Sequence, residues 1–198
     1  QARNIAVSAA ITSAFPPDSL NALFRVEQFW RHSLAVALKA GELAGQRRSV
    51  DPPSAFTAGI LHDMGRLAMF HADPAGLDQV VAMVIRGDSD LLSLEESVLQ
   101  YDHAAVGARL ARRWNLPDGI AEAIGRHHNR GVDAGALACV ISDADAWCIA
   151  SGFLPGYVVP AAPHTPVAAK PAPVRQLEQK VEELMALVLA SPVGVSGL

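Results

Sequence analysis

Five histidines, which could bind a metal ion, lie in four short sequence motifs. The sequence has 7 His, and five of them occur in the strings WRHS, LHDMG, YDHAAVG and RHH, as His32, His62, His103, His127 and His128. Only His71 and His164 lie outside such strings. His32 falls three residues after Phe29 and four before Val36, so a helix would direct its imidazole toward the core. A buried imidazole needs a partner there.

Carboxylates accompany these histidines. His62 and Asp63 are adjacent, about 100° apart around a helix, so both can reach one point only where other helices come close. The string ISDADAW places Asp143 and Asp145 among apolar residues, where a carboxylate needs a compensating partner. Imidazole nitrogens and carboxylate oxygens are ligands of zinc, iron and manganese, and a carboxylate can bridge two ions. The set predicts a divalent metal site.

Each residue also has a simpler interpretation. A single inward histidine is often a hydrogen-bonded core residue, a His-His pair at a helix end often caps the last carbonyls, and an aspartate near a helix start is often an N-cap. The distribution of these residues over five predicted helices favours metal binding, provided that the helices form one bundle.

The elements that must position these residues are predicted to be helices throughout. Apolar residues recur at steps of three and four, without a sustained alternation of the strand type. After an apolar helix over 2–15, we expect helices over 19–45, 51–70, 73–86, 93–114 with a break near Asp102, 115–128 and 133–151. Ser19, Asp51 or Ser54, and Asn115 are the expected caps. The first long helix would bury Leu23, Val26, Phe29, Trp30 and Val36.

The chain divides into a core and a tail. Residues 1–152 form the expected core, 153–173 a linker rich in Pro and Ala, and 174–198 an amphipathic helix and its end. Leu177, Val181, Leu184 and Val188 share one face of that helix. This spacing fits a short coiled coil and fits docking on the core equally well.

Composition limits the function classes. The net charge of −4 and pI near 5.9 argue against a protein that mainly wraps duplex nucleic acid. Cys139 and Cys148 match no zinc or redox motif and predict two reduced thiols. No apolar run reaches the roughly 20 residues of a membrane span, so we expect a cytoplasmic protein that does not enter membranes.

Together the strings FWRHSLAVA, AFTAGILHDMGRLAM, YDHAAVGARLARRWNLPDGIAEAIGRHH and DADAW resemble the HDOD branch of the HD superfamily, whose relatives include the HD-GYP cyclic dinucleotide phosphodiesterases. The resemblance runs from about Ala2 to Gly152 and implies an all-α HD-domain helical bundle. It implies a first ion held by His32, His62, Asp63 and Asp145. It also implies that Asp63 bridges to a second ion held by His103, His127 and His128. Asp145 fits better than Asp143 because its Ala-Asp pair lies at the expected distance before Gly152.

Three positions depart from the resembled enzymes. Gln28 stands where those enzymes have a glutamate that can bind a third ion. Arg66 stands where they have a lysine that contacts a substrate phosphate, and the arginine keeps the positive charge. The segment NRGVDAGAL after His128 lacks the GYP loop, which argues against hydrolysis of cyclic dinucleotides. The family's N-terminal helical half is also missing from the sequence, which suggests a fragment of a longer protein.

Two functions follow from the resemblance. The first is a regulatory, signal-transducing module that retains its metal site and interacts with another signalling domain or protein. The alternative is an active phosphohydrolase on a nucleotide or other phosphoester, with Asp63 and Arg66 as catalytic residues and Arg126 or Arg130 as helpers. The expected cofactor is one or two divalent ions, with Fe, Mn, Zn, Ni and Mg not distinguished. A phosphate-containing small molecule and a second copy of the chain, joined through the tail helix, are further expected partners.

Overall fold

The computed structural model describes residues 24–129, 131–156 and 170–190 of the chain. They fold into helices joined by short connections, which confirms the all-α prediction. The elements are α2 (Val26–Arg47), α3 (Pro52–Leu61), α4 (Met64–Ala72), α5 (Pro74–Arg86), α6 (Leu91–Leu99), α7 (His103–Arg113), α8 (Asp118–Arg126), a 3-10 turn (Val132–Ala134), α9 (Ala136–Ala150) and α10 (Ala172–Ala190). The helix expected over 2–15, the cap at Ser19 and the apolar side chain of Leu23 lie outside the described residues.

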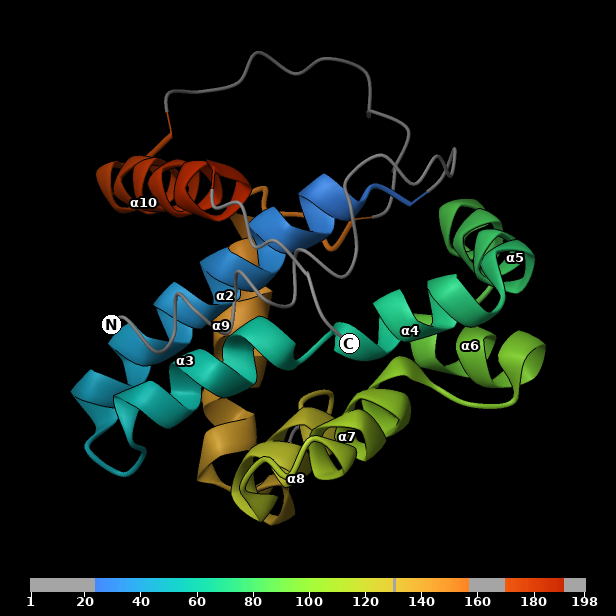
Figure 1. Cartoon of the computed structure of the whole chain (residues 1–198), viewed down its shortest axis with the longest axis horizontal. Coiled ribbons are helices and arrows are strands. Elements are labelled where there is room, and N and C mark those ends of the chain that lie inside the picture. The colour runs from blue at the N-terminus through green and yellow to red at the C-terminus, as the bar shows by residue number, and fades with distance from the viewer. Residues whose placement is uncertain (1–23, 130, 157–169, 191–198) are drawn as a thin grey trace, which may run out of the picture.

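Helix α2 packs against α3, α9 and α10, and α7 packs between α4 and α8, while α5 pairs with α6 (Figure 1). Gly59 shows how close the first of these contacts is. A Cβ atom on Gly59 would lie 2.8 Å from the Cα of Ala37, so only glycine lets α3 approach α2 this closely. That approach brings the end of α3 close to the middle of α2.

An aspartate caps the N-terminus of four of the described helices. In each, the carboxylate accepts a hydrogen bond from a backbone N–H three residues later: Asp51 from Ser54, Asp73 from Gly76, Asp90 from Ser93 and Asp102 from Ala105. These caps confirm the predicted break at Asp102 and select Asp51 over Ser54 as the cap of α3.

Three predicted boundaries were wrong. Helix α2 begins at Val26, because Arg25 is extended and its N–H donates to the Gly156 carbonyl at 2.7 Å. The helix expected over 51–70 is interrupted at Asp63, which separates α3 from α4. Asn115 adopts a left-handed conformation with φ 53°, so Pro117 instead of Asn115 precedes α8.

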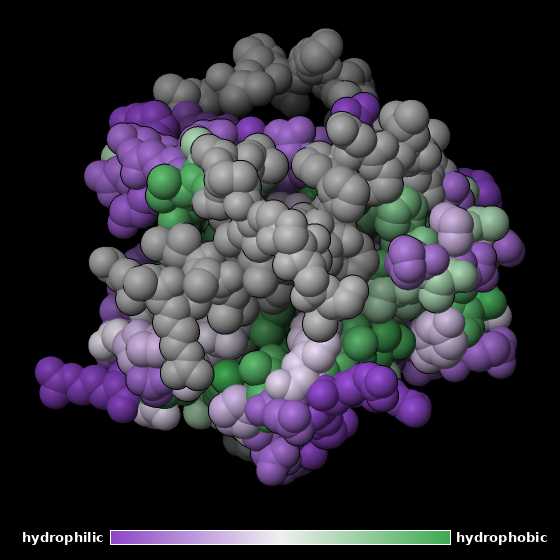
Figure 2. All heavy atoms as spheres, in the orientation of Figure 1, coloured by the Kyte–Doolittle hydropathy of each residue, from purple (hydrophilic) through white to green (hydrophobic). Residues whose placement is uncertain are grey.

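The core is apolar, as the helix periodicity predicts. Val26, Phe29, Trp30 and Val36 are all buried on α2. Cys148 is buried and Cys139 partly buried, and both are free thiols. Figure 2 shows patches of apolar side chains in the lower part and at the sides of the drawn face, and hydrophilic side chains along its lower edge. Within the described part of the chain, no helix combines the length and apolar character needed to cross a membrane.

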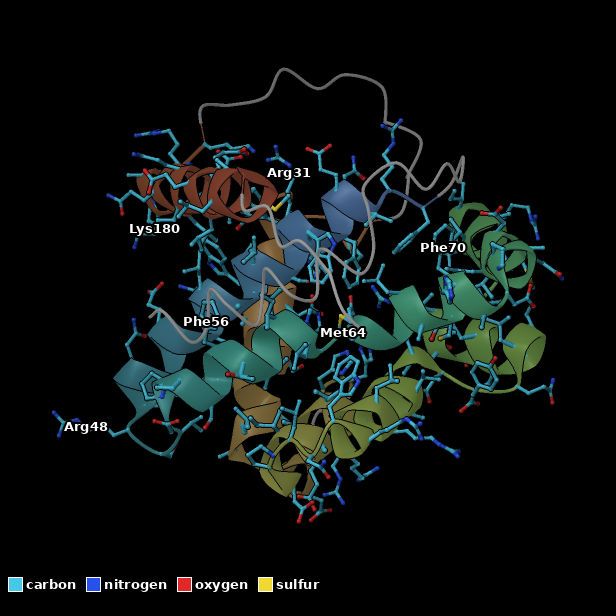
Figure 3. All side chains as sticks on the ribbon, viewed as in Figure 1. Arg31, Arg48, Phe56, Met64, Phe70 and Lys180 are labelled. Atoms are coloured by element: carbon cyan, nitrogen blue, oxygen red, sulfur yellow. The ribbon has the colours of Figure 1, made fainter. Side chains whose placement is uncertain are left out.

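Helix α10 docks on the core through its apolar face. Leu177 and Val181 are buried, whereas the side chain of Val188 lies outside the described set. Arg31 on α2 forms a two-pronged ion pair with Glu182, whose second contact joins Nη2 to Oε2 at 3.0 Å (Figure 3). The sequence left open a short coiled coil or docking on the core, and in the structure α10 docks on the core.

Candidate metal centre

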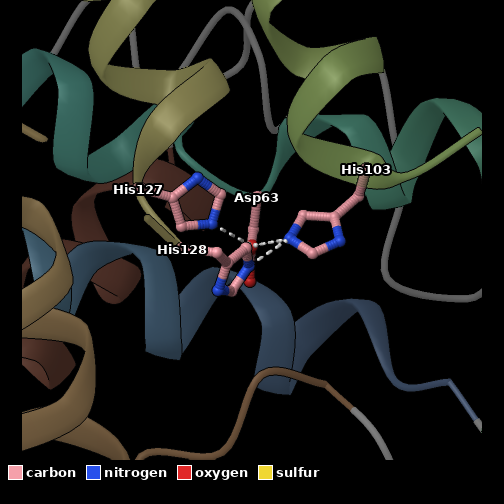
Figure 4. Close-up of side chains that lie close together, drawn as sticks. All are labelled: Asp63, His103, His127 and His128. Atoms are coloured by element: carbon pink, nitrogen blue, oxygen red, sulfur yellow. Dashed lines mark hydrogen bonds and ion pairs between the residues drawn. The ribbon is translucent and has the colours of Figure 1, made fainter. Parts of the chain in front are cut away.

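The predicted ligands meet around the carboxylate of Asp63, although they are far apart in the sequence. The residues are His32 on α2, His62 and Asp63 in the turn between α3 and α4, His103 on α7, His127 and His128 directly after α8, and Asp145 on α9. Figure 4 shows four of the side chains, with the carboxylate of Asp63 between the imidazoles of His103, His127 and His128.

The break between α3 and α4 lets neighbouring residues face the same point. Asp63 has φ −99° and ψ 6°, outside helical geometry, and its carbonyl accepts the Arg66 N–H at 2.9 Å. As a result, the His62 Nε2 atom lies 3.5 Å from Asp63 Oδ2. A continuous helix would hold these two side chains about 100° apart.

We call His32, His62, Asp63 and Asp145 the first cluster. Ligand atoms of its first three residues lie within 4.8 Å of one another. The His32 Nε2 atom is 3.8 Å from Asp63 Oδ2 and 3.2 Å from Asp145 Oδ1. His62 Nε2 lies 4.0 Å from the same Asp145 oxygen. Two imidazoles and two carboxylates therefore surround one small volume.

We call Asp63, His103, His127 and His128 the second cluster, whose ligand atoms also lie within 4.8 Å of one another. Here the other carboxylate oxygen is used: Asp63 Oδ1 is 3.3 Å from His103 Nε2 and 3.6 Å from His127 Nε2. The Nε2 atoms of His103 and His128 are 2.8 Å apart. Asp63 thus offers one oxygen to each cluster, as a bridging carboxylate would.

Backbone carbonyls orient three of the imidazole rings. The Nδ1 atom of His32 donates to the Phe153 carbonyl at 2.9 Å, that of His62 to Gly59 at 2.7 Å, and that of His127 to Ile124 at 2.6 Å. Because a carbonyl oxygen can only accept, each Nδ1 carries hydrogen and each Nε2 keeps its lone pair for the centre. Among the residues that the structure describes, these three buried Nε2 atoms have no hydrogen-bond partner.

Burial and neighbouring charge prepare the groups for a cation. Burial lowers the pKa of His62 to about 4, although Asp63 opposes the effect. It likewise lowers the pKa of His128 to about 2, with help from His127 and His103. For Asp63, burial raises the pKa, but the charges of Arg66 and His62 outweigh it and hold the pKa well below its usual value. His62 and His128 are therefore neutral imidazoles near an ionised Asp63 carboxylate at neutral pH.

Arg66 lies inside the centre and not at its rim. Its side chain is buried, Nη1 donates to Asp63 Oδ2 at 2.6 Å, and Nη2 is 3.2 Å from His103 Nε2. The position expected to meet a phosphate is thus engaged with the proposed bridging carboxylate.

Other predicted residues lie apart from the centre. Asp143 is exposed and pairs with Arg47 at 2.6 Å, so the geometry favours Asp145 as the sequence did. Arg126 is exposed and donates to the Asp133 carbonyl at 2.9 Å. Arg130 lies outside the described residues.

Sequence reasoning missed Glu95. This side chain of α6 is fully buried, and its Oε2 atom accepts hydrogen bonds from the Nδ1 and backbone N–H groups of His103 at 2.6 and 2.8 Å. In the sequence it is one of two adjacent glutamates, a pattern typical of a solvent-facing helix surface. Its contact with the imidazole becomes apparent only from the hydrogen bonds that join α6 to His103.

The donor set fits divalent cations. Unpartnered buried Nε2 atoms and the unpartnered Oδ1 atom of Asp63 are costly in a closed core unless something binds them. Nitrogen and carboxylate oxygen suit zinc, iron, manganese and nickel better than magnesium, which prefers oxygen alone. The buried His and Asp side chains can therefore hold a metal ion.

Comparison with known proteins identifies the family of this chain. The HDOD domain model matches residues 1–130. A ribonuclease Y from Lawsonia intracellularis is 32% identical over 127 residues, which cover 64% of this chain and 18% of that protein. The chain spans less than a fifth of the length of the curated relatives it matches, between 14% and 18%.

Solved structures share the fold. A candidate phosphohydrolase from Shewanella amazonensis superposes with a TM-score of 0.63 at 24% identity, covering 94% of this chain and 69% of that one. A protein from Marinobacter aquaeolei, named as a candidate signal transduction protein, gives a TM-score of 0.63 at 19% identity, covering 93% and 42%. With the family match over most of the chain and the helical bundle around a His/Asp cluster, the protein belongs to the HDOD domain family.

Proposed function

We propose that this chain is an HDOD regulatory module that binds one or two divalent cations. They would bind at the Asp63 centre, by which we mean the first and second clusters together. The observation that supports it best is that the two carboxylate oxygens of Asp63 face different clusters. Oδ2 faces the histidines of the first cluster and Oδ1 those of the second. In this proposal the first cluster holds one ion and the second cluster the other. Bound cations would supply positive charge and Lewis acidity at the centre.

The protein's own residues would then select what reaches the ions. The centre is closed on most sides, because His32, His62 and His103 are almost fully buried. His128 is only partly buried and the Asp145 side chain is 16% exposed, so these two residues form its more open side. A phosphate-containing ligand would bind there, and its binding could be signalled to a partner domain.

Metal analysis of the purified protein tests the proposal. We expect up to two equivalents of a transition metal, or uptake of Mn²⁺ or Zn²⁺ after treatment with EDTA. Asp63→Ala should abolish binding at both clusters, and Asp145→Asn should weaken only the first. Asp143→Asn is the matched control, because Asp143 lies on the same helix but pairs with Arg47. A folded protein that takes up no cation would refute the proposal.

A second candidate function is hydrolysis of a phosphoester. It is supported by the similarity to ribonuclease Y and to the candidate phosphohydrolase, and by two clusters that share a carboxylate. Against it, the Arg66 guanidinium would have to leave Asp63 to contact a phosphate.

The two functions are separated by assays on the metal-loaded protein. Bis(p-nitrophenyl) phosphate and a short single-stranded RNA, each with Mn²⁺ or Fe²⁺, are suitable substrates. Turnover that disappears in Asp63→Ala would establish the enzyme. Tight metal binding without turnover of either substrate would favour the regulatory function.

A further inference from the structure

The imidazole of His103 is held differently from the other oriented rings. His32, His62 and His127 donate their Nδ1 hydrogens to neutral backbone carbonyls. His103 instead donates to the carboxylate of Glu95, at 2.6 Å. This difference distinguishes the second cluster from the first.

Glu95 is not explained by the fold alone. Its side chain is fully buried, and burying a carboxylate is costly unless its partners compensate. Within the described ranges, its Oε2 atom accepts two hydrogen bonds, both from His103, while its buried Oε1 atom has no partner. Capping of α7 does not require it, since Asp102 already caps that helix through the N–H of Ala105.

The contact determines what His103 presents to the centre. With Nδ1 donating to Glu95, the Nε2 atom points at Asp63 Oδ1, 3.3 Å away. A carboxylate partner fixes the ring, its tautomer and its rotation, and makes the opposite nitrogen a stronger electron donor than a carbonyl partner does. The buried Glu95 carboxylate therefore fixes the orientation of one imidazole of the second cluster and makes its Nε2 atom a stronger electron donor.

We propose that Glu95 is a positioning residue that sets the cation affinity of the second cluster through His103, while the first cluster does not depend on it. The inference rests on the proposed cation binding at the Asp63 centre. Loss of such a carboxylate partner typically weakens metal affinity by about 10- to 100-fold. We expect Glu95→Gln to weaken one of two cation sites by about that factor.

The test is a Co²⁺ titration of the EDTA-treated full chain, followed by calorimetry and by the visible absorption of the bound ion. Wild type should bind two ions. Glu95→Gln should weaken one site and change its absorption band, and Glu95→Ala should weaken it further. The matched control is Glu96→Gln, because Glu96 is the exposed neighbour on the same helix. It should behave as wild type.

A double variant separates positioning from a general structural effect. If Glu95 acts through His103, Glu95→Gln should add nothing in a His103→Ala background. A further loss there, or equal weakening of both sites by Glu95→Gln alone, would overturn the inference. So would unchanged binding of two ions by Glu95→Gln and Glu95→Ala. Wild type that binds no cation would instead overturn the proposed function, and the inference with it.

Discussion

Gly65 and the carbonyl group of His103 touch at the crossing of α4 and α7. A Cβ atom added to Gly65 would overlap the His103 carbonyl oxygen, and the His103 carbonyl carbon would be only 2.7 Å away. Both obstacles are backbone atoms at the start of α7, which cannot rotate away as a side chain end can. This contact places His103 next to the Asp63 turn.

Gly65→Ala should therefore destabilise the protein, because α4 and α7 must separate to accommodate the methyl group. Overpacking of this kind costs about 1–3 kcal/mol, and more where the backbone cannot move. Urea unfolding followed by circular dichroism measures it. Gly45→Ala on α2 is the control, since nothing lies within 4 Å of its Cβ position, and it should stabilise by about 0.5–1 kcal/mol. Equal stability of the two variants would contradict the close contact.

Asp63→Asn should lower the stability of the metal-free protein as well as its cation binding. Arg66 and the surrounding imidazoles would lose the buried carboxylate that they face. Removing one member of a buried ion pair costs about 3–5 kcal/mol. The free energy of unfolding in EDTA checks this, and Asp143→Asn at an exposed ion pair should change it by less than about 1 kcal/mol. A more stable Asp63→Asn protein would mean that repulsion between the Asp63 carboxylate and its neighbours outweighs the attraction of Arg66.

Acid should destabilise the metal-free protein through His62. The pKa of this histidine falls from 6.5 to about 4 on folding because of burial, so the unfolded chain binds its proton at a higher pH than the folded one. Stability is then lost as the pH falls from about 6.5 toward 4, by roughly 3 kcal/mol at most. His128, with its pKa also lowered, acts in the same direction.

Two other groups of the centre, His103 and Asp63, also affect the pH dependence. For His103, burial and Arg66 lower the pKa, but Asp63 and Glu95 outweigh them and raise it, so its contribution is lost as the pH rises. Asp63 contributes above the usual carboxylate pKa and loses its effect only in stronger acid. Urea unfolding in EDTA at pH 7.5, 6 and 5 measures the sum. His62→Gln should flatten the profile, and an unaltered slope would show that His62 is not responsible.

Val181→Asp should release α10 from the core. Val181 is fully buried against the bundle, where an unpaired carboxylate has no compensating partner. Faster hydrogen exchange and proteolysis within 172–190 are the expected signs. Lys180→Asp introduces the same side chain at the exposed neighbouring position and should leave both rates near wild type. If both variants resist protease as wild type does, the docking face has been assigned incorrectly.

The residues that meet around Asp63 could be singled out from the sequence because histidine and aspartate are the residue types that commonly bind metal ions. Helix periodicity turned His32 inward, and the cap preference of Asp102 marked the start of α7. The turn at Asp63 escaped prediction because neither glycine nor proline stands at positions 61–64, and the apolar pattern continues across it. The interruption is seen only in the fold, where it lets His62 and Asp63 face one point.

Two other features could not be read from the chain. Glu95 and Glu96 look alike in sequence, and only packing shows that one is buried and the other exposed. Arg66 was expected at a phosphate, whereas the fold places it on Asp63. In both cases the deciding partner comes from another helix or from an unpredicted turn.

The bond between His32 and the Phe153 carbonyl joins positions 121 residues apart. Phe153 follows α9, in the stretch whose Gly156 also receives the Arg25 N–H just before α2 begins. One imidazole of the first cluster is thus tethered by a piece of chain with no helix of its own. Because the Phe153 carbonyl accepts the Nδ1 hydrogen of His32, the direction in which the opposite nitrogen of that ring points depends on where residues 153–156 lie.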